Sequence, residues 1–217
     1  MPRWQATFVG LIALLIPACN DSHPGLTRVA CVGDSITDGG GIADHRNDIY
    51  PMVLQRLLGE GYDVRNFGDC GSALMMQSDK PYRREKAYRL ALEYRPDVVV
   101  ILLGTNDSKP WNWQHAADFT YDYVALVHTF QELRSRPRVF LCTPVPAFPG
   151  GMGINDTCIR TEVKPKVEEV GRELNLPVID LYTNLSGKPE LFSDRVHPNE
   201  AGARLIAEVV ARAIEGK

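Results

Sequence analysis

Three residues from two distant parts of the chain have the side chains needed for nucleophilic catalysis. Ser35 lies in the segment CVGDSITDG, residues 31–39, while Asp194 and His197 lie near the end of the sequence. A serine hydroxyl is a poor nucleophile at neutral pH unless a base such as His197 accepts its proton. The imidazole in turn needs an anionic partner that holds one tautomer and stabilises the developing positive charge. We therefore predict that Ser35 is a nucleophile, His197 its general base and Asp194 the orienting acid.

Acyl transfer also needs hydrogen-bond donors for the oxyanion that forms on the substrate. The candidates are the Ser35 backbone N–H, the Asn106 side-chain amide and a glycine N–H in the segment NFGDCG, residues 66–71. Either Gly68 or Gly71 could supply this N–H. We prefer Gly71 because of its place at the end of the segment, and because a residue without Cβ lets a ligand approach the backbone closely.

An alternation of strand-like and helix-like patterns would position these residues. The segment PDVVVILLG, residues 96–104, is uninterrupted and apolar, which is typical of a central parallel strand buried on both faces. The other strands are expected at residues 27–33, 62–68, 137–144 and 176–182. Apolar residues at helical spacing predict helices at residues 47–61, 81–94, 114–135, 160–175 and 198–216.

This alternation predicts an α/β protein with a parallel sheet covered by helices on both faces and joined by right-handed crossovers. Ligands of such sheets bind outside the carboxyl ends of the strands. The polar segments that contain Ser35, Gly71 and Asn106 each follow a predicted strand, and His197 precedes the last helix. Taken alone, Ser35 would be read as an ordinary helix cap. Its placement at one sheet edge with the other segments favours the nucleophile.

Four segments resemble the successive signature blocks of the SGNH (GDSL-type) hydrolase family. They are GDSITDG (33–39), the Gly71 segment, GTND (104–107) and DRVHP (194–198), and they occur in the family's order. The resemblance implies a single hydrolase domain, residues 26–217, with a flavodoxin-like three-layer α/β/α fold and strand order 2-1-3-4-5. It also implies esterase chemistry without a metal or an organic cofactor.

The family's site residues carry over to positions of this sequence that match its blocks. Ser35 matches the nucleophile, whose own N–H joins Gly71 and Asn106 as an oxyanion donor, and His197 and Asp194 match the base and its acid. The resemblance therefore implies the same roles that the residue types predict.

Four further residues are candidates for contacts to the substrate: Asp34, Trp111, Trp113 and Met152. Indole faces stack on sugar rings, but the two tryptophans could equally form a plug over the core. Asp34 could instead bond nearby backbone amides, as short acids do in turns. Met152 lies in the long Pro/Gly-rich segment 143–157, and such loops often act as lids or pocket walls, although this one could equally pack down.

Together these patterns predict a serine esterase that removes short acyl groups, acetyl above all, from a carbohydrate. The sugar assignment depends on expected export, the tryptophan pair, and the similarity of GTNDSKPWNW, residues 104–113, to exported carbohydrate-esterase-like family members. A lipase or lysophospholipase, a thioesterase and an arylesterase are alternatives within the family. A non-catalytic glycan-binding module is the alternative from another class. The expected partner is therefore a small-molecule or polysaccharide ester. Nucleic acid is not an expected partner, because a net charge of -3 and a pI of about 6.0 give no overall attraction to phosphate backbones.

The N-terminus has the pattern of a secretory signal, expected at residues 1–18. A segment with Arg3 and no acid precedes the apolar run VGLIALLIPA, residues 9–18, which is shorter than the roughly 20 residues of a membrane span. The sequence IPAC resembles a bacterial lipobox, which would make Cys19 the lipidated first residue and a membrane tether. The alternative is simple cleavage near Ala18. Both predict a periplasmic or cell-surface protein, and the sequence does not set its oligomeric state.

The sequence contains four cysteines besides Cys19: Cys31, Cys70, Cys142 and Cys158. An exported protein can form disulfides, and four cysteines allow three pairings between which the sequence does not choose. We favour Cys142 with Cys158, because they flank one loop. None of the spacings is typical of zinc ligands, so no metal is expected.

Overall fold

The sheet has the strand order expected from the sequence. The computed structural model describes residue 1 and residues 25–216, so Cys19 and all but the first residue of the expected signal at 1–18 lie outside the described residues and stay predictions. A parallel sheet runs in the order β2-β1-β3-β4-β5. The strands are β1 (Thr27–Gly33), β2 (Tyr62–Gly68), β3 (Val98–Leu102), β4 (Arg138–Cys142) and β5 (Val178–Ile179).

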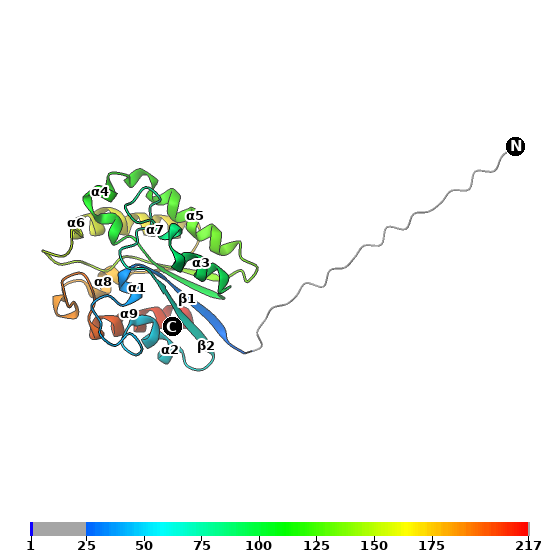
Figure 1. The fold of residues 1–217 in the computed structure, drawn as a ribbon, viewed down its shortest axis with the longest axis horizontal. Helices are drawn as coiled ribbons and strands as arrows, with labels where there is room; N and C mark the ends of the chain where they lie inside the picture. Colours follow the sequence, from blue (N-terminus) through cyan, green and yellow to red (C-terminus); the bar gives the residue numbers. More distant parts are fainter. Residues whose placement is uncertain (2–24, 217) are drawn as a thin grey trace.

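Helices cover both faces of this sheet, which confirms the three-layer α/β/α architecture (Figure 1). They are α1 (Ser35–Asp38), α2 (Tyr50–Leu58), α3 (Lys86–Glu93), α4 (Pro110–Trp113), α5 (Phe119–Gln131), α6 (Asp156–Cys158), α7 (Lys164–Glu173), α8 (Leu181–Leu185) and α9 (Glu200–Glu215). Short 3-10 turns precede α3 and α5, and a π-helical turn, Ile159–Val163, leads into α7. In the part of the chain that the structure describes, no helix combines the length and apolar character needed to cross a membrane.

The two faces of the sheet carry separate apolar clusters. Successive side chains of a strand point to opposite faces, so Val29 and Cys31 of β1 pack with α2 and α9, while Ala30 and Val32 pack with α3, α5 and α7. All five residues of β3 are buried, as its uninterrupted apolar sequence predicts. The core therefore lies on both sides of β3, and the strand ends are left to carry polar groups.

The favoured disulfide between Cys142 and Cys158 is wrong. Cys142 packs in the cluster with α9 on one face, whereas Cys158 packs in the cluster with α5 and α7 on the other. The four cysteines within residues 25–216 are all free. Sequence neighbourhood across a loop could not show that the sheet separates these two thiols.

The fifth strand is shorter than the sequence predicts. The expected segment 176–182 forms only Val178–Ile179, because the side chain of Asp180 accepts a hydrogen bond from Thr183 N at 3.0 Å and starts α8. A capping aspartate thus ends the strand within an apolar stretch. Asp180 also accepts a hydrogen bond from Thr143 Oγ1 at 3.2 Å, which ties this turn to the end of β4.

The register aligns the carboxyl ends of the first three strands. Gly33, the last residue of β1, lies level with Gly68 of β2 and Leu102 of β3. Gly68 packs so closely on α1 that a Cβ there would lie 2.2 Å from the backbone nitrogen of Asp38. The segments after these strands therefore begin side by side, and the position of α1 depends on Gly68.

We predict that Gly68→Ala destabilises the fold and that Gly61→Ala, at the other end of β2, does not. The first places a methyl group against backbone and should lower the free energy of unfolding by about 1–3 kcal/mol or more. A Cβ at Gly61 meets nothing within 4 Å, so this matched variant should be neutral or gain up to about 1 kcal/mol. Urea unfolding of the two variants and the parent measures the difference. Equal stabilities would contradict the close packing of Gly68 on α1.

Candidate active site

Ser35, His197 and Asp194 form a continuous hydrogen-bonded chain. Ser35 is the first residue of α1, directly after β1, and its Oγ lies 2.9 Å from Nε2 of His197. The other ring nitrogen, Nδ1, lies 2.6 Å from Oδ2 of Asp194. The serine and histidine are each only 7% exposed, so the bond between them is largely shielded from water, whereas the Asp194 side chain is 36% exposed. This is the geometry in which an imidazole can take a proton from a serine hydroxyl.

The loop before α9 holds Asp194 and His197 on the same side. Arg195 between them has a φ of 74°, which makes the turn tight. The other carboxylate oxygen of Asp194, Oδ1, accepts the backbone N–H of Val196 at 3.1 Å and that of His197 at 2.7 Å. Burial alone would raise the pKa of Asp194, but the hydrogen bonds from the ring and backbone of His197 outweigh it and lower the pKa. Asp194 is therefore ionised at neutral pH.

The segments after β2 and β3 bring the candidate oxyanion donors together. Asn106 is 5% exposed, and its Nδ2 donates one hydrogen to the carbonyl of Ser72 at 3.0 Å. An amide nitrogen has two hydrogens, so this bond orients the side chain and leaves the second hydrogen for a ligand. Gly71 has a φ of 81°, and a Cβ there would meet only the Lys80 side chain, at 3.9 Å. This open position supports Gly71 over the tightly packed Gly68 as the third donor beside the Ser35 N–H.

Asp34, which the sequence also suggested as a substrate contact, is fully buried instead. Its Oδ1 accepts the N–H of Ile36 at 2.9 Å and so caps α1, while Oδ2 has no hydrogen-bond partner among the described residues. Burial raises the pKa of Asp34 to about 6, and the Ile36 hydrogen bond offsets only part of this. The carboxylate thus positions the turn that carries Ser35 and does not face a substrate.

A second buried acid, Asp107, links the two oxyanion segments. Its carboxylate accepts the backbone N–H groups of Leu74 at 2.8 Å and Met75 at 2.9 Å. Burial raises the pKa of Asp107 to about 6 as well. Asp107 is next to Asn106 in sequence, so these bonds hold the segment after Gly71 against the asparagine.

The structure separates the two tryptophans that the sequence pairs. Trp113 packs edge-on against Phe119, with ring centroids 5.6 Å apart, and its Nε1–H donates to Glu162 at 2.8 Å. Trp111 is 51% exposed. Packing on the core explains Trp113, which is half-buried, so Trp111 presents the larger exposed indole surface. Met152 is 60% exposed and has a φ of 46°, at the tip of the loop after β4.

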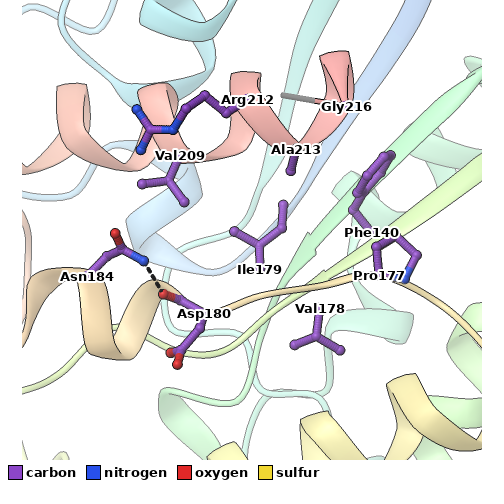
Figure 2. Close-up of a pocket in the computed structure, with 10 residues that line it drawn as sticks. All are labelled: Phe140, Pro177, Val178, Ile179, Asp180, Asn184, Val209, Arg212, Ala213 and Gly216. Carbon is purple, nitrogen blue, oxygen red and sulfur yellow. Dashed lines mark hydrogen bonds between the residues drawn. The ribbon is translucent and has the colours of Figure 1, made fainter.

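Two cavities differ in their relation to these residues. A pocket of about 500 Å³ lies at the sheet edge between β5, α8 and α9, where Figure 2 shows Val209, Ala213 and Ile179 around one space. It contains none of the three triad residues. A second pocket, of about 580 Å³, is lined by residues 147–151 and 153–157. We call these residues and Met152 the β4–α6 loop.

The β4–α6 loop is joined to the segment that carries Asp194 and His197. Phe148 N donates to the carbonyl of Arg195 at 2.8 Å, and the Arg195 guanidinium donates to the carbonyl of Pro149. The loop that lines this pocket is thus bonded to the segment of Asp194 and His197, and none of the three triad residues lines the pocket itself.

Within residues 25–216, no group of three or more His, Cys, Asp or Glu side chains could hold a metal ion.

We predict that Asp34→Asn becomes more stabilising, or less destabilising, as the pH rises from 4 to 7. The folded-state pKa of about 6 lies above the ordinary 3.8, so the acid's contribution to stability is full below pH 3.8 and is lost as the pH rises through 6. Asparagine does not ionise, and its free energy of unfolding relative to the parent should rise by about 3 kcal/mol over this range.

Urea unfolding at several pH values measures this, with the exposed Asp44→Asn as control. The pKa of Asp44 is lowered, first by a hydrogen bond from Asn47, so its replacement should shift stability in the opposite direction. A difference between Asp34→Asn and the parent that does not change with pH would contradict the buried, proton-binding carboxyl.

Comparison with known proteins relates this geometry to other chains. Residues 31–205 match the model of the GDSL-like Lipase/Acylhydrolase family. An acetylxylan esterase from Xylanibacter ruminicola is 40% identical over 206 residues, which cover 87% of this chain and 43% of that protein. The chain therefore spans less than half the length of this curated relative.

Solved structures show the same fold. A lipase/acylhydrolase from Enterococcus faecalis superposes with a TM-score of 0.72 at 29% identity, over 88% of this chain and 96% of that one. A carbohydrate acetylesterase from Sinorhizobium meliloti gives a TM-score of 0.72 at 17% identity, over 88% and 99% of the two chains. The family match covers all the segments that form the site, from Ser35 to His197. The chain belongs to the GDSL-like lipase/acylhydrolase family.

Proposed function

We propose that this protein is a serine esterase that removes acetyl groups from a carbohydrate. The observation that carries the proposal is the chain of hydrogen bonds from Ser35 Oγ through both ring nitrogens of His197 to Asp194, at 2.9 and 2.6 Å. A purely structural serine needs no buried imidazole that is itself bonded to a carboxylate. A glycan-binding module without catalysis would not need the three groups together either.

The geometry supports a two-step acyl transfer. Ser35 Oγ attacks the ester carbonyl carbon while His197 Nε2 takes the hydroxyl proton, and the ionised Asp194 stabilises the imidazolium that results. The Ser35 and Gly71 N–H groups and the free hydrogen of Asn106 Nδ2 donate to the oxyanion. The imidazolium then protonates the sugar oxygen as its bond to the carbonyl carbon breaks, so the sugar leaves with a free hydroxyl and the acetyl group stays on Ser35. Water, deprotonated by His197, attacks this ester and releases acetate and the free serine.

The carbohydrate part of the proposal draws on the relatives and on Trp111. The acetylxylan esterase is 40% identical to this chain, and a carbohydrate acetylesterase shares the fold. Trp111 leaves half of its surface exposed close after the oxyanion residue Asn106. Export directed by residues 1–18, and a lipid on Cys19, would bring such an enzyme to polymers outside the cytoplasm.

We expect Ser35→Ala to lose hydrolysis of p-nitrophenyl acetate by about 10⁴-fold or more, because the variant lacks the nucleophile and retains only binding and oxyanion donors. Release of p-nitrophenol measures the rate. The matched control is Ser186→Ala in an exposed position at the end of α8, where the hydroxyl donates only to the carbonyl of Tyr182. Undiminished hydrolysis by Ser35→Ala would remove Ser35 as nucleophile.

A substrate panel tests the acyl and alcohol groups. The parent should release acetate from acetylated xylan or acetylated xylo-oligosaccharides and should act poorly on p-nitrophenyl palmitate, because the pocket of the β4–α6 loop is lined largely by glycine and polar residues rather than by a long apolar channel. Acetate release and p-nitrophenol release are the two readouts. Faster turnover of the long-chain ester would favour a lipase, and acyl-thioester hydrolysis above both would favour a thioesterase.

A further inference from the structure

Trp111 is exposed, yet its indole ring is held in one orientation. Its Nε1–H donates to Oδ2 of Asp79 at 2.9 Å, and the outer edge of the ring lies against Gly153, where a Cβ would be 3.0 Å from the indole Cη2. Lys109 Nζ lies 5.7 Å from the ring centroid. An exposed indole that is already immobilised loses little entropy when a ligand stacks on it. The Trp111 ring is therefore both exposed and fixed in orientation, as a surface for ring stacking requires.

The second oxygen of Asp79 holds a buried asparagine. Asp79 Oδ1 accepts from Asn112 Nδ2 at 2.9 Å, and the Asp79 backbone N–H donates back to Asn112 Oδ1 at 2.9 Å. Burial alone would raise the pKa of Asp79, but the hydrogen bonds from Trp111 and Asn112, with the charge of Lys109, hold it below its ordinary value. The carboxylate is thus charged at neutral pH and accepts from both partners at once.

Asn112 passes this connection on to the oxyanion residue. It is 1% exposed, and its Nδ2 also donates to the backbone carbonyl of Asn106 at 2.9 Å. Both amide hydrogens and the amide oxygen of Asn112 therefore have partners, which fixes the side chain in one orientation. An unbroken set of hydrogen bonds runs from the exposed Trp111 through Asp79 and Asn112 to Asn106.

The β4–α6 loop contacts both Trp111 and the segment that carries Asp194 and His197. Gly153 of this loop touches Trp111, while Phe148 of the same loop is hydrogen-bonded to Arg195, between Asp194 and His197. The loop that lines the cavity of about 580 Å³ thus contacts the indole at Gly153 and the segment that carries Asp194 and His197 at Phe148. Trp111 is therefore connected to the site both through this loop and through the hydrogen bonds that end at Asn106.

We propose that Asp79 is a positioning residue that aligns Trp111 as a stacking platform for the sugar of the ester and, through Asn112, holds Asn106 in place for the oxyanion. The platform rests on the proposed carbohydrate esterase function, whereas the link to Asn106 applies to any ester. Replacement of the carboxylate by an amide removes one of its two acceptors. Asp79→Asn must therefore loosen Trp111 or Asn112, or weaken both contacts.

Steady-state kinetics on an acetylated xylo-oligosaccharide and on p-nitrophenyl acetate test the proposal. Trp111→Ala should raise KM for the oligosaccharide by about 3- to 10-fold, the loss of one aromatic stacking contact. Asp79→Asn should raise this KM in the same direction, and it should also lower kcat on p-nitrophenyl acetate more than Trp111→Ala does. A merely structural defect would lower active enzyme and kcat and leave KM as it was.

Matched variants elsewhere on the surface provide the controls. Tyr121→Ala removes an aromatic side chain that is 76% exposed, and Asp118→Asn changes an exposed acid that makes no capping hydrogen bond at the start of α5. Both should keep the parent's KM and kcat. Thermal unfolding of each variant shows that it is folded. Kinetics of Asp79→Asn and Trp111→Ala that match these controls on both substrates would overturn the proposal.

The double variant Asp79→Asn/Trp111→Ala separates positioning from independent binding. Since Asp79 acts on the sugar through Trp111, the double variant should have the KM of Trp111→Ala, whereas multiplied effects would show that Asp79 contacts the sugar itself and would overturn its role. Acetate release by the parent is read in the same assay. If the parent cleaves p-nitrophenyl acetate but no acetylated oligosaccharide, the proposed carbohydrate substrate and the stacking role of Trp111 are both overturned. In that case, kcat of Asp79→Asn on p-nitrophenyl acetate still tests the link from Asp79 to Asn106.

Discussion

The hydrogen bond between Ser35 and His197 is the contact on which the rest of the site depends. It joins residues 162 positions apart, one just after the first strand and the other just before the last helix. Neither segment can make this bond unless β1 lies in the sheet and α9 packs on the face that also holds α2. The packing of α9 beside α2 and β1 through the shared apolar cluster is what sets the distance. Burial then keeps water from competing for either nitrogen of the ring.

Two buried carboxyl groups hold the segments of the site in place, and burying them lowers the stability of the fold when they are ionised. Asp34 caps the turn that carries Ser35, and Asp107 accepts two backbone N–H groups from the segment after Gly71. Each lies fully out of water, which is why each has a pKa of about 6. Residues that position a reacting group this tightly need not be good for stability. Asp79 likewise holds Trp111 and Asn112 by accepting a hydrogen bond from each. Because Asp79 is exposed, its charge carries a smaller desolvation penalty.

Several features of the fold and site could be predicted because they depend on residue patterns over a few neighbouring positions. The uninterrupted apolar segment of β3, the alternation of strands and helices, and the order of the family's segments led to the observed sheet and to the meeting of Ser35, Asp194 and His197. Gly68 packs closely on α1 and Gly71 lies in an open position, and the role of Gly71 as an oxyanion donor stays a prediction. The length of β5 was not predictable in this way, since the cap of α8 at Asp180 competes with the apolar pattern around it.

By itself, the sequence determined the residue types that can do acyl chemistry and the strand ends at which they lie, because periodicity and turn residues act over a few positions. The tertiary structure alone decided contacts between distant segments. It placed Cys142 and Cys158 on opposite faces of the sheet, packed Trp113 on Phe119 and left Trp111 exposed. It also joined Asp79 to Asn112 and Trp111, and no short-range pattern marks these three as one unit. Those outcomes depend on which side chains meet across the sheet and its loops. The spacing of residues along the chain does not determine these long-range contacts.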